Sequence, residues 1–228
     1  KLERRYAAGL SLLGAFTYSK ALGISEGGDQ STVMDTRDRR RDYGPLPYDQ
    51  RLRFTLSFAY ELPFGKGKQM LNSIPAWANV ALGGWQLGGI VTMRAGEARA
   101  PAGNVSANVG RSDRNRPDRV GVGNLPRGDR GVTRWFDTSA FRSQSFGRFG
   151  NSGEGVLRMP GANNWDLSLL KNFRVTETSS LQFRSEFFSA FNHPLYGFPG
   201  LTIGTPQFGV ITTASGSRSI QMALKLIW

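Results

Sequence analysis

The side chains that most often carry out catalysis or bind metals are scarce in this chain. It has no cysteine and a single histidine, His193. A lone histidine lacks the partners that a zinc site or a nucleophilic triad needs, and Asn192-His193-Pro194 has the composition of a turn. No Ser–His–acid order, paired-carboxylate pattern or glycine-rich phosphate loop is present. The sequence therefore predicts a protein that is not an enzyme, with no catalytic residue, no metal site and no cofactor.

Arginine is the side chain that indicates binding chemistry. Segment 95–163 carries eleven arginines and no lysine, and the planar guanidinium suits carboxylates and phosphates. We expect this segment to hold lipopolysaccharide phosphates or another, unidentified anionic ligand; the alternative is a solvated loop held by its own acidic residues. The candidate ligand residues are Arg111, Arg114, Arg116, Arg119, Arg127 and Arg130. Five aromatic residues are expected to give the segment a small core: Trp135, Phe136, Phe141, Phe146 and Phe149.

The net charge of +12 suits nucleic acid, anionic lipid or an acidic ligand. A second basic run, at 39–41, is the candidate for nucleic acid. Aspartates surround it and nearly balance its charge: Asp29, Asp35, Asp38 and Asp42. We therefore expect no nucleic-acid binding.

Abundant glycine and aromatic residues favour β-structure with many turns. Six stretches alternate apolar and polar residues, which predicts strands with one apolar face. They are 6–20, 50–62, 84–94, 165–173, 181–192 and 217–228. No run of 18 apolar residues exists, so no transmembrane helix is expected, but barrel strands escape that test because they are only half apolar.

The clearest strand, 50–62, has an uncharged apolar face and a polar face. In an outer-membrane barrel the apolar face meets lipid and the polar face lines a wet lumen. The residues expected to face the lumen are Arg51, Arg53, Glu61, Arg184 and Glu186. Glu61 and Glu186 are expected to pair with Arg53 or Arg184 rather than to act as acid–base catalysts. Lys171 falls on an apolar face, where its stem is expected to reach a head-group region.

The connections sort by length. Those at 21–49, 95–163 and 193–216 are long and fall at one end of the predicted strands, while those at 63–83 and 174–180 are shorter and fall at the other. Long loops outside and short turns on the periplasmic side are typical of bacterial barrels. Six strands cannot close a membrane barrel, because the smallest have about eight. Either two strands lie hidden in the loops, or further strands precede residue 1.

Several stretches resemble the C-terminal barrel portion of TonB-dependent outer-membrane receptors, most closely the Oar-like group with a carboxypeptidase-regulatory-like N-terminal domain. The match is most specific at Asn163-Asn164-Trp165-Asp166 and at Phe191-Asn192-His193-Pro194. It runs in order along the chain, through 84–90, 135–137, 163–173, 181–194 and 220–226.

The resemblance implies an all-β fold: an antiparallel transmembrane β-barrel segment of about six to eight strands, from a 22-stranded barrel with long extracellular loops. Residues 1–228 would be roughly the last quarter of one barrel domain in the outer membrane of a Gram-negative-type cell. The plug domain, through which TonB would act, and the signal peptide are expected upstream. The closing strand is expected to be read by the barrel-assembly machinery, with Trp228 in place of the usual phenylalanine; the signal residues are Gln221, Leu224, Leu226 and Trp228.

Two alternatives stay open at this point. One is a small, complete outer-membrane porin or adhesin barrel of about eight strands that uses its loops for attachment. The other is a soluble β-sandwich that binds an anionic partner and buries its apolar faces between two sheets.

Overall fold

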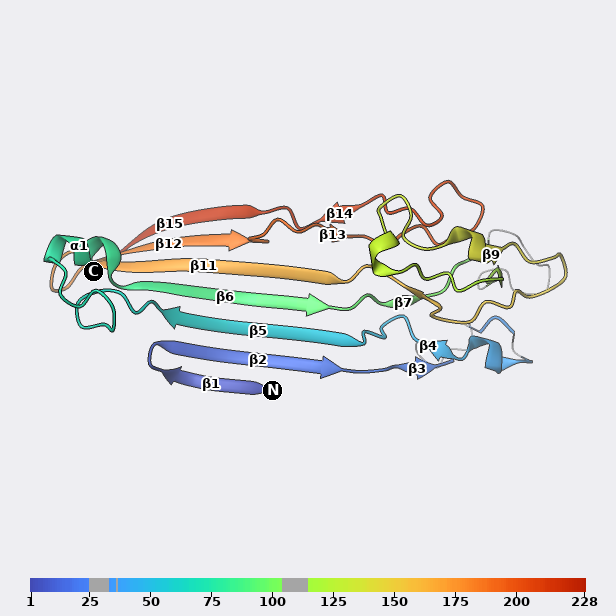
Figure 1. Ribbon diagram of the computed structural model, residues 1–228, viewed down its shortest axis with the longest axis horizontal. Helices are drawn as coiled ribbons and strands as arrows, with labels where there is room; N and C mark the ends of the chain where they lie inside the picture. Colours follow the sequence, from blue (N-terminus) through green and yellow to red (C-terminus); the bar gives the residue numbers. More distant parts are fainter. Residues whose placement is uncertain (25–32, 36, 104–114) are drawn as a thin grey trace.

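The computed structural model describes residues 1–24, 33–35, 37–103 and 115–228. Its main feature is one antiparallel sheet that contains all seven of the long strands in these residues (Figure 1). The strands are β1 (Leu2–Ala7), β2 (Leu10–Tyr18), β5 (Leu52–Glu61), β6 (Trp85–Arg94), β11 (Ala162–Arg174), β12 (Ser180–Phe188) and β15 (Ser219–Ile227). They pair in chain order as a meander, so the all-β, antiparallel fold is confirmed.

The strand predicted at 6–20 is confirmed as β2 from Leu10 to Tyr18, but its N-terminal bound is wrong, because residues 6–9 belong to β1 and to a hairpin turn. β1 and β2 pair with Ala7 opposite Leu10, and the turn between them consists of Ala8 and Gly9. Both turn residues have positive φ, 52° and 78°, as a two-residue turn of the primed type requires. Ala8 is an unusual residue for that position, which is why the turn gave no signal in the sequence. The sheet therefore has seven long strands where six were predicted.

The registers of the five strand pairs from β2 to β15 keep the apolar and polar faces separate across the sheet. A typical apolar row is Leu12, Phe58, Gly89, Leu167, Phe187 and Ile220, one residue from each strand from β2 to β15. The neighbouring row on the other face is Ser11, Ala59, Gly88, Ser168, Glu186 and Gln221. Because side chains alternate along each strand, these pairings give the sheet one oily and one wet face.

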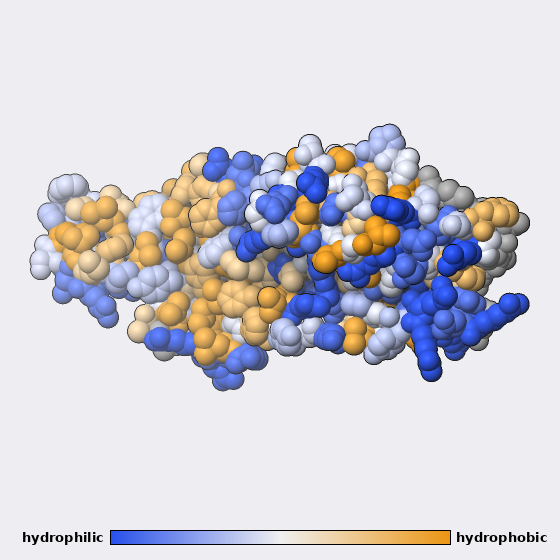
Figure 2. All heavy atoms as spheres, turned by 45° about the vertical axis from the view of Figure 1, so that its right-hand side comes forward, coloured by the Kyte–Doolittle hydropathy of each residue, from blue (hydrophilic) through white to orange (hydrophobic). Residues whose placement is uncertain are grey.

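The apolar face has no second sheet packed against it in the described part of the chain. On β15 alone, Met222 and Leu224 are 68% and 67% exposed. The remaining sheets of the described residues are two-stranded and lie toward one end of the long strands (Figure 1). Figure 2 shows hydrophobic residues gathered over the strands and more hydrophilic residues toward the right-hand end of the view. The described residues thus show no second layer of the kind that a soluble β-sandwich would place over this face.

The two ends of the sheet differ. At the turn end lie the Ala8-Gly9 turn, residues 62–84 with helix α1 (Ala76–Leu82), and residues 175–179 (Figure 1). At the loop end lie three longer connections, 19–51, 95–161 and 189–218. These hold the short elements β3 (Leu22–Gly23), η2 (Arg39–Asp42), β4 (Gly44–Pro45), β7 (Ala98–Arg99), β8 (Asp118–Arg119), η3 (Arg127–Asp129), η4 (Thr138–Ala140), β9 (Phe141–Arg142), β10 (Leu157–Arg158), β13 (Leu195–Tyr196) and β14 (Ala214–Ser215). No helix among the described residues is long and apolar enough to span a membrane.

The three longer connections pack together into one unit, called the loop body here. Its core consists of Phe136, Ala140, Phe141, Leu157, Met159 and Ile203. Phe136 packs edge-on against Phe141 at 6.0 Å and against Phe208 at 5.1 Å between ring centroids. Ile203 and Phe208 come from the third connection, so the second connection does not fold on itself alone. Of the five aromatic residues expected in this core, Phe136 and Phe141 lie in it and Trp135 packs against it. Phe146 is 75% exposed, and neither it nor Phe149 is part of this core.

Candidate functional site

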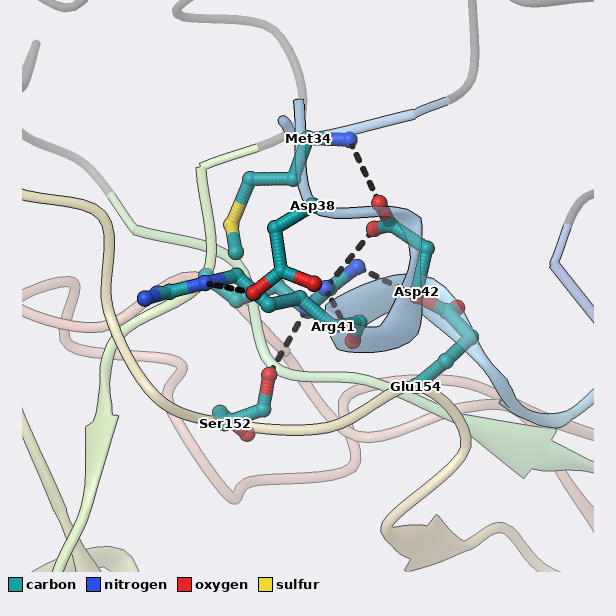
Figure 3. Close-up of polar contacts among 7 residues, drawn as sticks. Met34, Asp38, Arg41, Asp42, Ser152 and Glu154 are labelled. Atoms are coloured by element: carbon teal, nitrogen blue, oxygen red, sulfur yellow. Dashed lines mark hydrogen bonds and ion pairs between the residues drawn. The ribbon is translucent and has the colours of Figure 1, made fainter. Parts of the chain in front are cut away.

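Arg116 joins two connections of the loop body from a buried position. Figure 3 labels its partners Arg41, Asp42, Ser152 and Glu154. The Arg116 side chain is 6% exposed, and its Nη2 lies 2.8 Å from Asp42 Oδ1, whose side chain is 1% exposed. Its Nη1 lies 2.7 Å from Glu154 Oε2. The guanidinium also donates to the backbone oxygens of Ser152 at 2.8 Å and Arg41 at 2.9 Å. These contacts occupy Arg116 inside the protein, which makes it a structural residue rather than part of a ligand surface.

Arg158 makes a second junction between the same two connections. Its Nη2 lies 2.5 Å from Asp49 Oδ2, and its Nη1 donates to the Asp49 backbone oxygen at 2.9 Å. The other carboxylate oxygen of Asp49 accepts the Ala21 amide at 2.7 Å. Burial alone would raise the pKa of Asp49. The hydrogen bonds from Ala21 and Arg158 and the Arg158 charge outweigh burial, and they hold this pKa below its ordinary value.

The Trp135-Phe136-Asp137 stretch, part of the receptor-like pattern, has a structural role. Phe136 lies in the core, and the Trp135 indole donates to the Arg158 backbone oxygen at 2.8 Å. Asp137 caps η4 by accepting the Ser139 hydroxyl at 2.8 Å and the Ser139 amide at 3.2 Å. The hydroxyl contact is the main cause that lowers the pKa of Asp137. This stretch therefore stiffens the loop body.

The remaining candidate ligand arginines differ in the number of contacts that they make within the protein. Arg119 donates to the backbone oxygens of Gly121 and Val122. Arg130 donates through Nε to Leu125 and lies over the Trp135 ring at 5.6 Å. Arg127 is exposed and forms no hydrogen bond or ion pair with any described residue. Arg111 and Arg114 lie outside the described residues.

The residues predicted to line a lumen divide into two groups. The registers place Arg53, Glu61, Arg184 and Glu186 on the polar face of the sheet. Arg184 pairs with Glu186, but Glu61 pairs with Lys68 at 2.9 Å and not with Arg53. The expected Glu61–Arg53 pair is wrong because the two residues lie at opposite ends of β5. Arg51 precedes β5 and stands at the loop end.

The sequence did not predict two groups of polar contacts, one at each end of the sheet. At the loop end of the polar face, Asn164 donates to Asp166 at 2.9 Å, and Ser189 donates to both side chains, also at 2.9 Å. Ser189 has φ 49°, so this network stabilises the unusual backbone that ends β12. The signal in the sequence was the Asn-Asn-Trp-Asp stretch, which resemblance identified without assigning it a role.

At the turn end, Lys171 lies on the apolar face but does not extend outward as expected. It is 2% exposed, and its Nζ donates to the backbone oxygens of Ala81 at 2.8 Å and Gly83 at 2.7 Å. It also lies over the Trp85 ring at 4.9 Å. Lys171 therefore satisfies carbonyl groups at the C-terminal end of α1, where a positive charge is favourable, and fastens this helix to the sheet.

The predicted assembly-signal residues lie at the free edge of the sheet. β15 pairs with β12 alone among the described strands. Leu224 and Leu226 are on the apolar face, Gln221 lies opposite Glu186 on the polar face, and Trp228 follows the strand at 88% exposed. No group of three or more histidine, aspartate or glutamate side chains in the described ranges is placed to hold a metal ion.

A sequence model of a family described as outer membrane beta barrel domain matches residues 1–221. No curated protein and no solved structure matches the chain. The family match covers nearly the whole sequence and agrees with the antiparallel sheet, its uncovered apolar face and its polar opposite face. The chain belongs to the outer membrane beta barrel domain family and is located in the outer membrane.

Proposed function

We propose that this chain forms part of the barrel wall of a TonB-dependent outer-membrane transporter or receptor. In this proposal the polar face lines the lumen, the loop body lies outside the cell and captures the ligand, and TonB acts through a plug domain elsewhere in the same protein. The barrel-assembly machinery would recognise β15 during insertion. The chain contributes binding and passage and no catalytic step.

The observation that carries the proposal is the pair of free sheet edges. β1 pairs only with β2, and β15 pairs only with β12, among the described strands. Unpaired backbone groups in lipid each cost several kcal/mol, so both edges require partners. β1 and β15 also run in the same direction, because they are the first and last of seven antiparallel strands. Closing them on each other would need a parallel pair, whereas bacterial barrels have even numbers of antiparallel strands.

These edges favour a barrel with more strands over a small barrel made of this sheet alone. The resemblance of 163–173 and 181–194 to the barrels of TonB-dependent receptors supports the large-transporter class in particular. The loop body supports a binding role, because its shared core and its two arginine junctions give three loops one defined surface. The ligand is not identified by these features.

The test uses the native protein from its source outer membrane. An antibody raised against residues 115–161 would isolate the protein for intact-mass measurement, and the isolated protein would be passed over immobilised C-terminal domain of TonB. We expect a mass several times 25.1 kDa and specific retention on the TonB column. A mass near 25.1 kDa would refute the large-barrel proposal. A large mass without retention would refute the TonB-dependent class and leave another kind of large barrel.

A further inference from the structure

A hollow of about 1010 Å³ lies where the apolar face of the sheet meets the loop body. Four of its lining residues form one row across four strands: Phe16 lies opposite Phe54, Phe54 opposite Met93, and Met93 opposite Asn163. The register places this row on the same face as Leu56 and Val91, the lipid-facing side of an outer-membrane barrel. The floor of the hollow is therefore the loop-end margin of the lipid-facing surface.

The loop body supplies the other wall. Arg127, Arg130 and Trp135 reach the hollow from the second connection, and Pro194 and Tyr196 reach it from the third. The body therefore overhangs the apolar face at its loop end.

The charge of this lining is one-sided. It contains Arg51, Arg94, Arg127, Arg130 and Arg158, and no described lining residue is an aspartate or glutamate. Asp49 neutralises Arg158. The guanidinium groups of Arg51, Arg94 and Arg127 make no hydrogen bond or ion pair with a described residue, and Arg130 uses only its Nε. Asp49 also attracts the charge of Arg51, and Arg94 lies opposite Arg53 on the polar face. Arg127 and Arg130 are therefore the positive charges that stand beside the apolar surface without a described counter-ion.

We propose that this hollow binds the phosphorylated head group of an outer-leaflet glycolipid, whose acyl chains lie on the row that includes Phe54 and Met93. Guanidinium groups form short, paired hydrogen bonds with phosphate, and lipid chains cover the exposed apolar floor. A small soluble anion would satisfy the arginines but would leave the floor bare. The proposal depends on membership of the outer-membrane barrel family and on the loop end facing outward, and it does not require TonB.

The test is a binding titration of the full-length native protein, purified in a neutral detergent. Trp135 fluorescence, or native mass spectrometry, would report binding of three probes: bisphosphorylated lipid A, its dephosphorylated form and inorganic phosphate. The variant is Arg127→Gln/Arg130→Gln. The matched control is Arg142→Gln/Arg148→Gln, which changes two exposed arginines of the same connection that lie outside the hollow.

We expect lipid A to bind, and the Arg127→Gln/Arg130→Gln variant to bind it on the order of tenfold or more weakly, because charge-assisted contacts are lost. The control should bind within about twofold of the native protein, as expected for arginines without a binding partner. Equal losses in the variant and the control would overturn the proposal. Equal affinity for the dephosphorylated lipid would also overturn it, since adsorption would then be apolar only.

Tight binding of inorganic phosphate, with competition against lipid A, would identify a soluble-anion site and overturn the choice of a lipid. Both double variants must retain the heat-modifiable gel mobility of a folded barrel. If the first does not, Arg127→Gln alone makes the same test, because Arg127 is exposed and has no described partner. The mass and TonB-retention measurements are separate, so either proposal can fail while the other stands.

Discussion

Replacing Arg116 with methionine should open the loop body without unfolding the sheet. The change keeps an apolar stem but removes a guanidinium that contacts Asp42 at 2.8 Å, Glu154 at 2.7 Å and two backbone oxygens. Asp42 would keep only the Met34 amide, at 3.1 Å, as a described partner. Removing one member of a buried ion pair costs about 3–5 kcal/mol, because the remaining charge is left uncompensated.

This cost falls on the junction between the first and second connections, since Asp42 belongs to one and Glu154 to the other. Cleavage of a locally opened segment follows the population of the open form when reclosing is fast. Each 1.4 kcal/mol is a factor of about ten, so protease cleavage within the loop body should accelerate by on the order of 10²-fold or more. The assay is limited proteolysis of the full-length protein in outer-membrane vesicles, with cleavage sites mapped by mass spectrometry.

Arg127→Met is the matched control, because Arg127 belongs to the same connection but is exposed and has no described partner. It should leave the cleavage rate nearly unchanged. A second variant, Arg116→Met/Asp42→Leu/Glu154→Met, should regain part of the protection, since apolar replacements of a whole buried ion cluster are often tolerated. Two results would refute the structural role of Arg116. One is a similar cleavage rate for the Arg116→Met and Arg127→Met variants. The other is a triple variant that regains no protection and whose barrel is unstable.

Three further outcomes follow from the faces and junctions of the sheet. Leu56→Lys, in the middle of β5, should reduce the folding free energy by about 2–4 kcal/mol because it puts a charge in lipid, whereas Ser57→Lys on the polar face should be tolerated. The yield of heat-modifiable folded protein in the outer membrane measures both effects. Equal yields of the two variants would contradict the assignment of the faces. Lys171→Met should weaken the docking of α1 on the sheet by about 1–3 kcal/mol, because two carbonyl groups lose their hydrogen-bond donor. A thiol reagent should therefore label a cysteine introduced by Ala78→Cys faster in this variant. The pKa of Asp49 is below its ordinary value of 3.8, so its stabilising contribution is complete above that pH and is lost as the pH falls through the lowered pKa; protease resistance of the loop body should fall in that acid range, and Asp49→Asn should remove the dependence.

Alternation along the chain was sufficient to locate six of the long strands and to assign their faces, because every second side chain of a strand points the same way. It failed at the first hairpin. Leu2 and Tyr6 continue the apolar pattern, and Ala8 carries none of the asparagine or aspartate signal of a primed turn. The sequence pattern also did not predict helix α1, because its seven residues are too few to establish a helical period.

The loop body was the least predictable part for a different reason. Its junctions connect residues far apart in the chain: Arg116 and Asp42 are 74 positions apart, and Arg158 and Asp49 are 109 apart. No local pattern reports such contacts. A core shared between the second and third connections was equally hidden, because Ile203 and Phe208 stand in a stretch of glycine and proline that resembles an ordinary loop.

The order of residues was sufficient to predict the amphipathic strands and the outer-membrane setting, because lipid on one side and water on the other impose a period of two. It also showed the richness in arginine. Which arginines are free to bind could be learned only from the folded chain. Arg116 and Arg127 are chemically identical, but distant carboxylates reach the first and no described group reaches the second. A guanidinium is available to a ligand only where folding leaves it without an internal partner, and that depends on the packing of loops far apart in sequence.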